Sequence, residues 1–448
     1  RATHARIMNR ASVVVLGAGP AGAATALGLA RLGYPVTVVS EWRRFDAVEG
    51  VSDRVLQGLR HAGLSQAATC ALPPGARTTR WNGDTRTLNH EHLIDRRAFD
   101  AALRRDLADA GIAVREATVR AVQADGDGHA IRIDTPAGEA TLHAAFVVEA
   151  RGRLAPLARD AMRGPQTLSL LNVWQGAPGD AASAIESLPD GWAWMARLPD
   201  GRCYWQATLD VATTTLPPRD ALPAWCATLR QTPLARDFFG AGGGDTGADA
   251  RVFARTSSAT LCGDAGGTNW LRVGDAAMAV DPLSGNGIFQ SLSSALQAPA
   301  VIHTLLAHPE RAALALRFHT RRITALFMRF ARIGRDFYAL DTQWADRPFW
   351  HARRAWPDDA PSHRAPDFDA LAIERAPVID GDTIVEADVV TSPDQPLGSW
   401  HLQGIPLAPI VAALRERPVA QVLAEFAPPQ AALVRHWLET QGYPFVRA

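Results

Sequence analysis

The strongest constraint on the fold lies near the N-terminus, where a short apolar run is followed by closely spaced glycines. Val13–Leu16 has the β-branched composition of a buried strand, and the GxGxxG spacing after it leads into a run with helical periodicity. Two of these glycines would let a pyrophosphate approach the backbone, and the third would let the helix pack on the strand. The sequence therefore predicts a βαβ unit with a dinucleotide-binding turn. The predicted cofactor-binding residues of this turn are Gly17, Gly19, Pro20, Ala21 and Gly22.

An acidic residue is expected about 20 positions beyond such a turn, because a carboxylate there accepts hydrogen bonds from a ribose. Glu41 follows Gly22 by 19 positions and comes directly after a second predicted strand. Ser40 is the alternative ribose contact, because an alignment shifted by one residue places it at the acidic position. A glycine-rich turn that binds no ligand remains the alternative for the whole segment.

A second glycine-containing turn lies far along the chain. Gly274 precedes Asp275, whose carboxylate could accept a polyol hydroxyl, and Asp281–Ile288 contains a turn that presents backbone amides at the start of a helical run. Such amides favour a group that carries negative charge. Alone, this segment is typical of many loop-to-helix turns, but together with the first turn it indicates a bound cofactor. The predicted contacts in this half are Asp275, Pro282, Gly285, Asn286 and Gly287.

Charge and composition exclude several classes of function. All 46 basic residues are arginine, so a pyridoxal Schiff base and a P-loop, which both need lysine, are excluded. The 46 acidic residues cancel the basic charge, and no overall field attracts nucleic acid or an anionic membrane. The four cysteines are scattered and the histidines have no ligand cluster beside them, so we expect no disulfide framework and no metal. The scattered cysteines favour a reducing compartment, and no uninterrupted apolar run could span a membrane, so we expect a cytoplasmic location.

The motifs together resemble the FAD-dependent monooxygenase superfamily that has the p-hydroxybenzoate hydroxylase fold. The resemblance runs over residues 10–330. It implies that the first turn and Glu41 bind the ADP part of FAD, and that the second turn binds the ribitol and lies along the isoalloxazine. The Asp95–Asp100 segment resembles the motif whose arginine contacts FAD, so Arg96 is an expected contact. Val119 falls where the backbone in this family meets adenine.

The resemblance implies an α/β fold, α+β in parts. A Rossmann-type FAD-binding domain would contain an inserted β-sheet substrate domain and would be followed by a small C-terminal module. The alternating, Trp-rich segments between the two glycine turns favour the inserted sheet. The glycine run 240–244 has no strand before it and is expected to be a surface loop. The expected ranges are 1–80, 94–164 and 256–345 for the FAD-binding domain, 81–93 and 165–255 for the substrate domain, 346–366 for a linker, and 367–448 for the C-terminal α/β module.

Departures from the superfamily pattern favour the branch that contains flavin-dependent halogenases and their relatives. The middle motif reads Glu149–Arg153 where Asp-Gly is usual, and Met278 stands where many aromatic hydroxylases carry histidine. Gly191–Trp194 resembles part of the halogenase tryptophan motif. However, a halogenase needs an active-site lysine, which this chain lacks. Halogenation is therefore disfavoured.

Within that branch, the chain resembles the flavoprotein monooxygenases that hydroxylate a tryptophan in the precursor of the tryptophylquinone subunit of quinohemoprotein amine dehydrogenase. This resemblance rests on the Glu49–Arg54 segment, the Asp281–Gly287 loop and the appended C-terminal tail. It implies that an electron-rich aromatic ring is hydroxylated with O₂ through a C4a-hydroperoxyflavin, and that a precursor peptide or protein is the partner. NAD(P)H or a separate flavin reductase would supply the electrons.

The sequence motifs say less about which residues contact the substrate, because in such enzymes the flavin performs the chemistry and no particular catalytic side chain is required. Glu49 could orient the substrate or the flavin, and Trp192 and Trp194 could form a wall of the substrate site together with Trp174 and Trp205. A surface or helix-capping carboxylate and ordinary tryptophan packing are the structural alternatives. The alternative functions are a small-molecule aromatic hydroxylase or epoxidase, a flavin-dependent reductase of isoprenoid double bonds, and a flavin-bearing maturation or docking protein.

Overall fold

The computed structural model describes residues 11–158, 160–240 and 250–445 of the 448-residue chain. Most of the expected glycine loop, residues 241–244, lies outside these ranges. The chain forms two compact units, Arg1–Pro299 with Phe327–Asp359 and Ala300–Leu326 with Ala360–Ala448. Two of the three boundaries between the units fall within the long helices α7 (Gly287–Ala307) and α8 (Ala312–Ala339), and the third follows Asp359.

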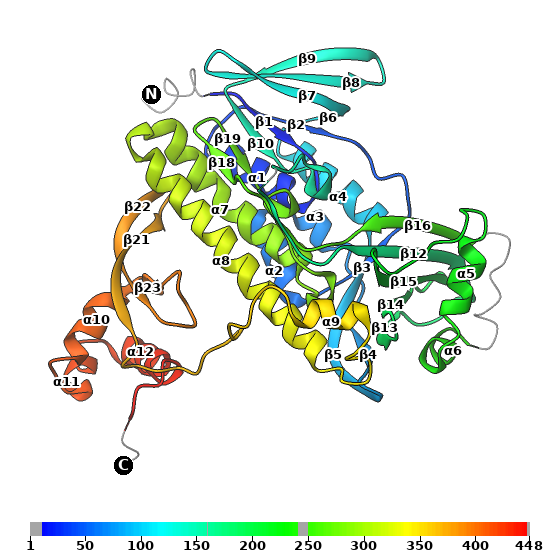
Figure 1. Ribbon diagram of the computed structural model, residues 1–448. Coiled ribbons are helices and arrows are strands. Elements are labelled where there is room, and N and C mark those ends of the chain that lie inside the picture. Colours follow the sequence, from blue (N-terminus) through cyan, green and yellow to red (C-terminus); the bar gives the residue numbers. More distant parts are fainter. Residues whose placement is uncertain (1–10, 159, 241–249, 446–448) are drawn as a thin grey trace. The chain divides into compact units, whose positions relative to one another are not determined.

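Six strands of the first unit form a mostly parallel sheet in the order β18-β19-β10-β1-β2-β6 (Figure 1). Only the edge pair β18 and β19 is antiparallel. All four residues of β1 are buried, as expected for a central parallel strand that is covered on both faces. The strands are β1 (Val13–Leu16), β2 (Val36–Ser40), β6 (Ala113–Glu116), β10 (Phe146–Glu149), β18 (Gly266–Gly267) and β19 (Trp270–Arg272).

Four helices lie between β1 and β6 in the chain. Helix α1 (Pro20–Arg31) begins with proline at its first turn, where the missing N–H costs nothing, and it contacts β1 and β2. Helix α4 (Arg96–Asp109) begins directly after Asp95, whose side chain accepts a hydrogen bond from the backbone N–H of Arg97 and so caps the helix, as a carboxylate in front of helical periodicity does. The other two helices are α2 (Asp53–Ala62) and α3 (Ser65–Ala68).

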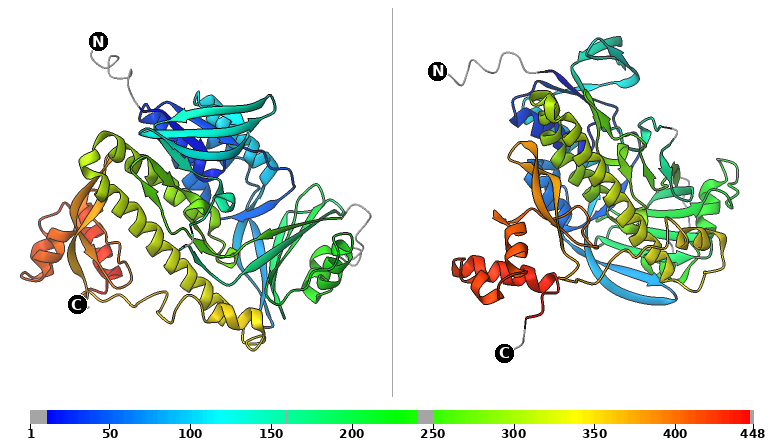
Figure 2. Two further views of the ribbon diagram at one scale, coloured as in Figure 1. Left: turned by 45° about the horizontal axis from the view of Figure 1, so that its top comes forward. Right: turned by 60° about the vertical axis from the view of Figure 1, so that its left-hand side comes forward.

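A three-stranded antiparallel meander covers one face of the six-stranded sheet, as Figure 2 shows. Its Ile131 and Ile133 are buried against Val14 and Leu16 of β1. The meander consists of β7 (Thr118–Asp125), β8 (Gly128–Thr135) and β9 (Gly138–Ala144), and a further small sheet contains β11 (Met162–Arg163), β17 (Thr260–Leu261) and β20 (Met278–Ala279).

The first unit also contains an eight-stranded sheet in the order β16-β12-β15-β14-β13-β4-β5-β3. All neighbours are antiparallel except β4 and β13, which pair in parallel. Three separate chain segments therefore build one sheet. Its strands are β3 (Val48–Val51), β4 (Gly75–Trp81), β5 (Asp84–Asp95), β12 (Thr167–Gln175), β13 (Ala182–Leu188), β14 (Gly191–Arg197), β15 (Arg202–Asp210) and β16 (Arg251–Thr256).

Three further helices belong to the first unit. Two of them lie between β15 and β16, within the range expected to form the β-rich substrate domain: α5 (Leu222–Leu229) and α6 (Pro233–Phe239). Both begin with proline near the first turn, and Cys226, Leu234 and Ala235 bury their apolar faces in the core of the sheet. The expected linker 346–366 contains the third helix, α9 (Pro348–Arg354).

Besides parts of α7 and α8, the second unit contains a two-stranded hairpin and three shorter helices among its described residues. The hairpin strands are β21 (Ala372–Asp380) and β22 (Thr383–Thr391), and β23 (His401–Leu402) pairs with β24 (Ile405–Pro406). Val411, Val434 and Leu438 are fully buried in its core. The helices are α10 (Leu407–Leu414), α11 (Val419–Leu423) and α12 (Pro428–Thr440).

Two features that would bear on function are absent from residues 11–158, 160–240 and 250–445. None of the helices in these ranges is long and apolar enough to cross a membrane. Within the same ranges, no three His, Cys, Asp or Glu side chains are gathered so that they could hold a metal ion.

Candidate flavin site

The first glycine turn has two tightly packed positions and one open position. Gly17 has a positive φ of 111°, and a Cβ atom there would lie 2.4 Å from the carbonyl oxygen of Ala150. A Cβ atom on Gly22 would lie 1.9 Å from the carbonyl oxygen of Gly17. By contrast, no other atom lies within 4 Å of the position that a Cβ would take on Gly19, at the N-terminus of α1. This open approach to a helix N-terminus suits a phosphate group.

The distant sequence motifs meet at the carboxyl ends of two neighbouring strands. β1 and β10 are parallel, with Leu16 opposite Glu149, and the strand order reverses between them. A Cβ on Gly274 would lie only 2.6 Å from the Cβ of Ala21, so the second glycine turn packs directly on the first. In open α/β sheets, ligands bind where the strand order reverses. The first glycine turn and Gly274 of the second, which are expected to bind the two halves of FAD, therefore lie together at such a point.

Asp275 lies at this point with unused capacity to accept hydrogen bonds. Its Oδ1 accepts a hydrogen bond of 2.9 Å from the Ser291 hydroxyl, and its Oδ2 lies 3.6 Å from Nε of Arg153. Burial raises the pKa of Asp275 above its ordinary value, although the Arg153 guanidinium opposes this shift. Since each carboxylate oxygen has two lone pairs, the side chain can still accept donors from a ribitol chain.

We expect Asp275→Ala to weaken FAD binding about 10- to 150-fold, the loss that corresponds to a charge-assisted hydrogen bond. The measurement is a titration of the apo-protein with FAD, followed by flavin fluorescence. Asp264→Ala is the matched control, because Asp264 is 47% exposed in its ion pair with Arg272 and belongs to neither glycine turn. Equal affinities of the Asp275 variant and the wild type would contradict the ribitol contact.

Arg96 is held by a network of carboxylates. Its Nη1 donates to Glu49, and its Nη2 donates to Asp100 at 2.8 Å, while Nε of Arg43 donates to Asp100 at the same distance. Burial disfavours the charged form of Arg96, but Glu49 and Asp100 raise its pKa above the ordinary value. Burial likewise favours neutral Asp100, but Arg96 and Arg43 bring the pKa of this carboxyl below its ordinary value. Arg96 is therefore a fixed positive charge, and Glu49 is its hydrogen-bond partner.

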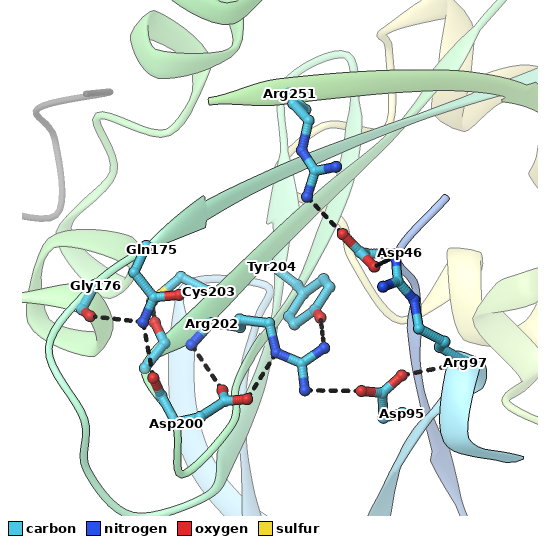
Figure 3. A network of polar contacts seen from close by, with 11 residues as sticks. Asp46, Asp95, Arg97, Gln175, Gly176, Asp200, Arg202, Cys203, Tyr204 and Arg251 are labelled. Atoms are coloured by element: carbon cyan, nitrogen blue, oxygen red, sulfur yellow. Dashed lines mark hydrogen bonds and ion pairs between the residues drawn. The ribbon is translucent and has the colours of Figure 1, made fainter. Parts of the chain in front are cut away.

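The eight-stranded sheet is tied to the first turn of α4, next to Arg96, by two ionic links (Figure 3). Arg202 of β15 forms a 2.7 Å ion pair with the capping residue Asp95. Asp46, whose side chain is only 9% exposed, joins Arg97 of α4 to Arg251 of β16. Sequence reasoning missed both links, because these partners lie far apart in the chain and have no spacing rule. Of these residues, only Asp95 is recognisable in the sequence, as a carboxylate at the start of a helix.

We expect Asp46→Asn to lower the free energy of unfolding by roughly 1.5–3 kcal/mol, because two arginines lose one buried anionic partner. Chemical denaturation of the apo-protein measures this change. Asp84→Asn provides the control, since Asp84 pairs with Arg86 at 3.1 Å but is 70% exposed, and solvent-exposed pairs contribute roughly 1 kcal/mol or less. A loss no larger than that of the control would show that the Asp46 link does not stabilise the protein.

The predicted contacts for the adenosine end lie together near the end of β2. The carboxylate of Glu41 accepts a hydrogen bond from the hydroxyl of Thr118, the residue before Val119 in β7. The Ser40 hydroxyl donates to the backbone carbonyl of Glu41 at 3.1 Å. Of the two candidates for the ribose, only Glu41 therefore directs its side chain toward the strand that carries Val119.

The loop expected along the isoalloxazine is open at its glycines. Asp281 Oδ1 accepts a hydrogen bond from the backbone N–H of Leu283 and caps a short turn at Pro282–Ser284. Gly285 has a positive φ of 62°, and no atom lies within 4 Å of a Cβ built on Gly285 or on Gly287. Asn286 donates its side-chain amide to the Ser284 carbonyl, at 2.5 Å. A flat ring system can thus approach the loop without meeting side chains from the glycines.

Of the four tryptophans expected to wall the substrate site, Trp194 is the one that keeps appreciable exposure. Trp174 and Trp205 are buried in the core between the sheet and helices α5 and α6. Trp192 is 2% exposed, and its indole N–H donates to the Tyr338 hydroxyl at 3.1 Å. Trp192 and Trp194 pack in the same aromatic cluster as Leu283 of the loop.

The chain is similar to a protein of solved structure over nearly its whole length. A model of the family described as FAD binding domain matches residues 10–184. A solved structure titled "Peptidyl tryptophan dihydroxylase QhpG essential for tryptophylquinone cofactor biogenesis" is 57% identical, covers 97% of this chain and 100% of its own chain, and superimposes with a TM-score of 0.86. The chain belongs to the QhpG family. The predicted α/β fold, the FAD cofactor and the monooxygenase class are confirmed, and the protein is an FAD-dependent oxidoreductase.

More distant matches place the QhpG family beside the halogenases, as the sequence departures indicate. Tryptophan 2-halogenase from Chondromyces crocatus is 25% identical over 375 residues, which are 76% of this chain and 70% of the halogenase. The flavin-dependent halogenase CmlS is 18% identical and shares the fold with a TM-score of 0.76, over 97% of this chain and 94% of its own. The fold is thus common to both kinds of enzyme.

Proposed function

We propose that this enzyme hydroxylates a tryptophan side chain in a precursor peptide or protein during the biogenesis of a quinone cofactor. One observation carries the proposal: the chain is 57% identical to QhpG, a peptidyl tryptophan dihydroxylase, over the whole length of that protein. The absence of lysine supports hydroxylation over halogenation, because no amine is present to capture a hypohalous acid.

The residues of this chain would hold FAD at two places. The open N-terminus of α1 at Gly19 would take the pyrophosphate, while Asp275 would accept ribitol hydroxyls. Arg96, fixed by Glu49 and Asp100, would place a permanent positive charge beside the cofactor. When bound and reduced, FAD supplies the activation of O₂ that oxygen insertion into an aromatic ring requires.

The eight-stranded sheet would present the substrate to this site. Trp194, which is partly exposed and packs in one cluster with Leu283, is our candidate for stacking on the substrate indole, and Trp192 would support it from the core. NAD(P)H or a separate reductase would deliver the electrons. A cytoplasmic location is supported by the four cysteines, which are free thiols.

The experiment that tests the proposal is incubation of the holoenzyme with reductant, ¹⁸O₂ and a tryptophan-containing precursor peptide, followed by mass spectrometry of the fragments. We expect ¹⁸O on the tryptophan residue, and no ¹⁸O on a matched peptide in which phenylalanine replaces that tryptophan. Oxygen found in a free aromatic metabolite but not in the peptide would support the small-molecule hydroxylase, and a reduced product formed without O₂ would support the reductase.

A further inference from the structure

We propose that Tyr338, near the end of α8, is a positioning residue for the loop expected to lie along the isoalloxazine, and that its hydroxyl joins this loop to strand β14 of the eight-stranded sheet. The inference rests on the proposed FAD site and adds to it a residue that no cofactor-binding motif contains.

Three side chains form a continuous line of hydrogen bonds. The indole N–H of Trp192 donates to the Tyr338 oxygen at 3.1 Å, and the Tyr338 hydroxyl donates to Oδ1 of Asp281 at 3.0 Å. The same Oδ1 accepts the backbone N–H of Leu283 at 2.9 Å. The Tyr338 hydroxyl accepts a hydrogen bond from Trp192 of the sheet and donates one to Asp281 of the loop. If Trp192 or Asp281 moves, Tyr338 moves with it, and the hydrogen bond on the other side changes.

The line is buried from end to end, and this makes each bond costly to lose. Asp281 is 9% exposed, Tyr338 1% and Trp192 2%. Gly334 lies one helical turn before Tyr338, and a Cβ atom on it would come 3.8 Å from the Cβ of Asp281, so this face of α8 packs against the loop. Leaving a buried donor or acceptor without its partner costs more than a surface hydrogen bond contributes.

The surrounding aromatic cluster holds the Tyr338 ring independently of its hydroxyl. The ring makes edge contacts with Phe349 and Trp350, at centroid distances of 5.7 and 5.8 Å. Leu283 of the loop packs against the same cluster. Removing only the hydroxyl therefore separates the hydrogen-bonded link from the packing of the ring.

The test compares Tyr338→Phe with the wild type in the full-length protein. We expect the dissociation constant for FAD to rise about tenfold, the effect of one buried hydrogen bond, and we expect the visible absorption bands of the bound flavin to shift. Tyr204→Phe is the matched control, because Tyr204 is fully buried in the same sheet and its oxygen accepts a hydrogen bond of 3.3 Å from Arg202, away from the loop. It should leave the flavin spectrum unchanged.

A second pair of variants tests the line from its other end. Trp192→Phe removes the first donor and should shift the flavin bands in the same direction, and adding it to Tyr338→Phe should produce no further shift. Trp205→Phe is the control, because it makes the same change of volume at a fully buried indole of the neighbouring strand β15, which packs against α5 and α6 and not against Tyr338, and it should cause no shift. If Tyr338→Phe does not fold, the contrast between the two tryptophan variants still tests the link.

Unchanged spectrum and FAD affinity in both Tyr338→Phe and Trp192→Phe would overturn the inference, and so would equal shifts in the two controls. These measurements involve no substrate, so the proposed tryptophan hydroxylation can fail while the positioning role holds. A wild-type protein that binds no FAD would instead overturn the proposed cofactor site itself.

Discussion

Replacing Gly17 by alanine is expected to abolish FAD binding and to lower the free energy of unfolding of the apo-protein by roughly 3 kcal/mol or more. Two costs add at this position. The backbone has a φ of 111°, which side-chain-bearing residues rarely adopt, and the new Cβ atom would lie 2.4 Å from the Ala150 carbonyl oxygen. The nearest atoms belong to the backbone of Ala150 and Arg151 and not to a flexible side chain, so either the turn or the segment that follows strand β10 has to move. Chemical denaturation and flavin release on heating measure the two effects.

Gly19→Ala is the control that separates folding from cofactor binding. Gly19 has a φ of −70°, and no atom lies within 4 Å of a Cβ built on it. The apo-protein should therefore keep its stability, while FAD binds more weakly because the methyl group occupies the approach to the N-terminus of α1. If this variant bound FAD as tightly as the wild type, the pyrophosphate would not lie against Gly19.

Arg96→Met should have the second-largest effect. It removes the cation that holds Glu49 and Asp100, and truncating one partner of a buried ion pair leaves the other charge uncompensated, at a cost of roughly 3 kcal/mol. Asp100 keeps its contact with Arg43, and Glu49 is 38% exposed and can be hydrated, so both carboxylates retain some compensation. We also expect the FAD affinity to fall at least tenfold, as for a lost charge-assisted contact. Denaturation of the apo-protein and FAD titration give the two values.

The matched control for this change is Arg86→Met. Arg86 also pairs with a carboxylate, Asp84, but the two side chains are 66% and 70% exposed. Such pairs contribute little, because water screens the charges and the long side chains lose entropy. Stability and FAD affinity should both stay at the wild-type values. If Arg96→Met retained wild-type FAD affinity despite losing stability, Arg96 would be a structural residue of α4 and no cofactor contact.

The sequence predicts best those parts of the molecule that local rules determine. Strand β1 lies at the predicted residues, because a run of four β-branched or aliphatic residues that ends at a glycine is typical of a short buried strand. Helix α4 starts after Asp95, because a carboxylate in front of helical periodicity is a strong N-cap. The two glycine turns are recognisable because only glycine fits the close contacts that Gly17 and Gly274 make.

Contacts between distant segments could not be predicted in this way. Nothing in the sequence around Tyr338 indicates that its hydroxyl reaches Asp281, and nothing around Arg202 indicates a contact with Asp95. These partners are set by how the sheet and the helices pack. Trp192 illustrates the same limit: the sequence suggests an aromatic wall, whereas only the packing shows that its indole is buried and hydrogen-bonded.

The order of strands in the eight-stranded sheet has a consequence for how the chain folds. Arg77 of β4 pairs with Ser183 of β13, and the edge strand β16 comes later still. Strands β3, β4 and β5 can pair with one another early, but the outer edge of β4 pairs with β13, which a ribosome synthesises much later, and pairings between such distant segments form slowly. Refolding from denaturant should be slow and prone to aggregation while the outer edge of β4 lacks β13, and fragments that end before β13 should not acquire native structure.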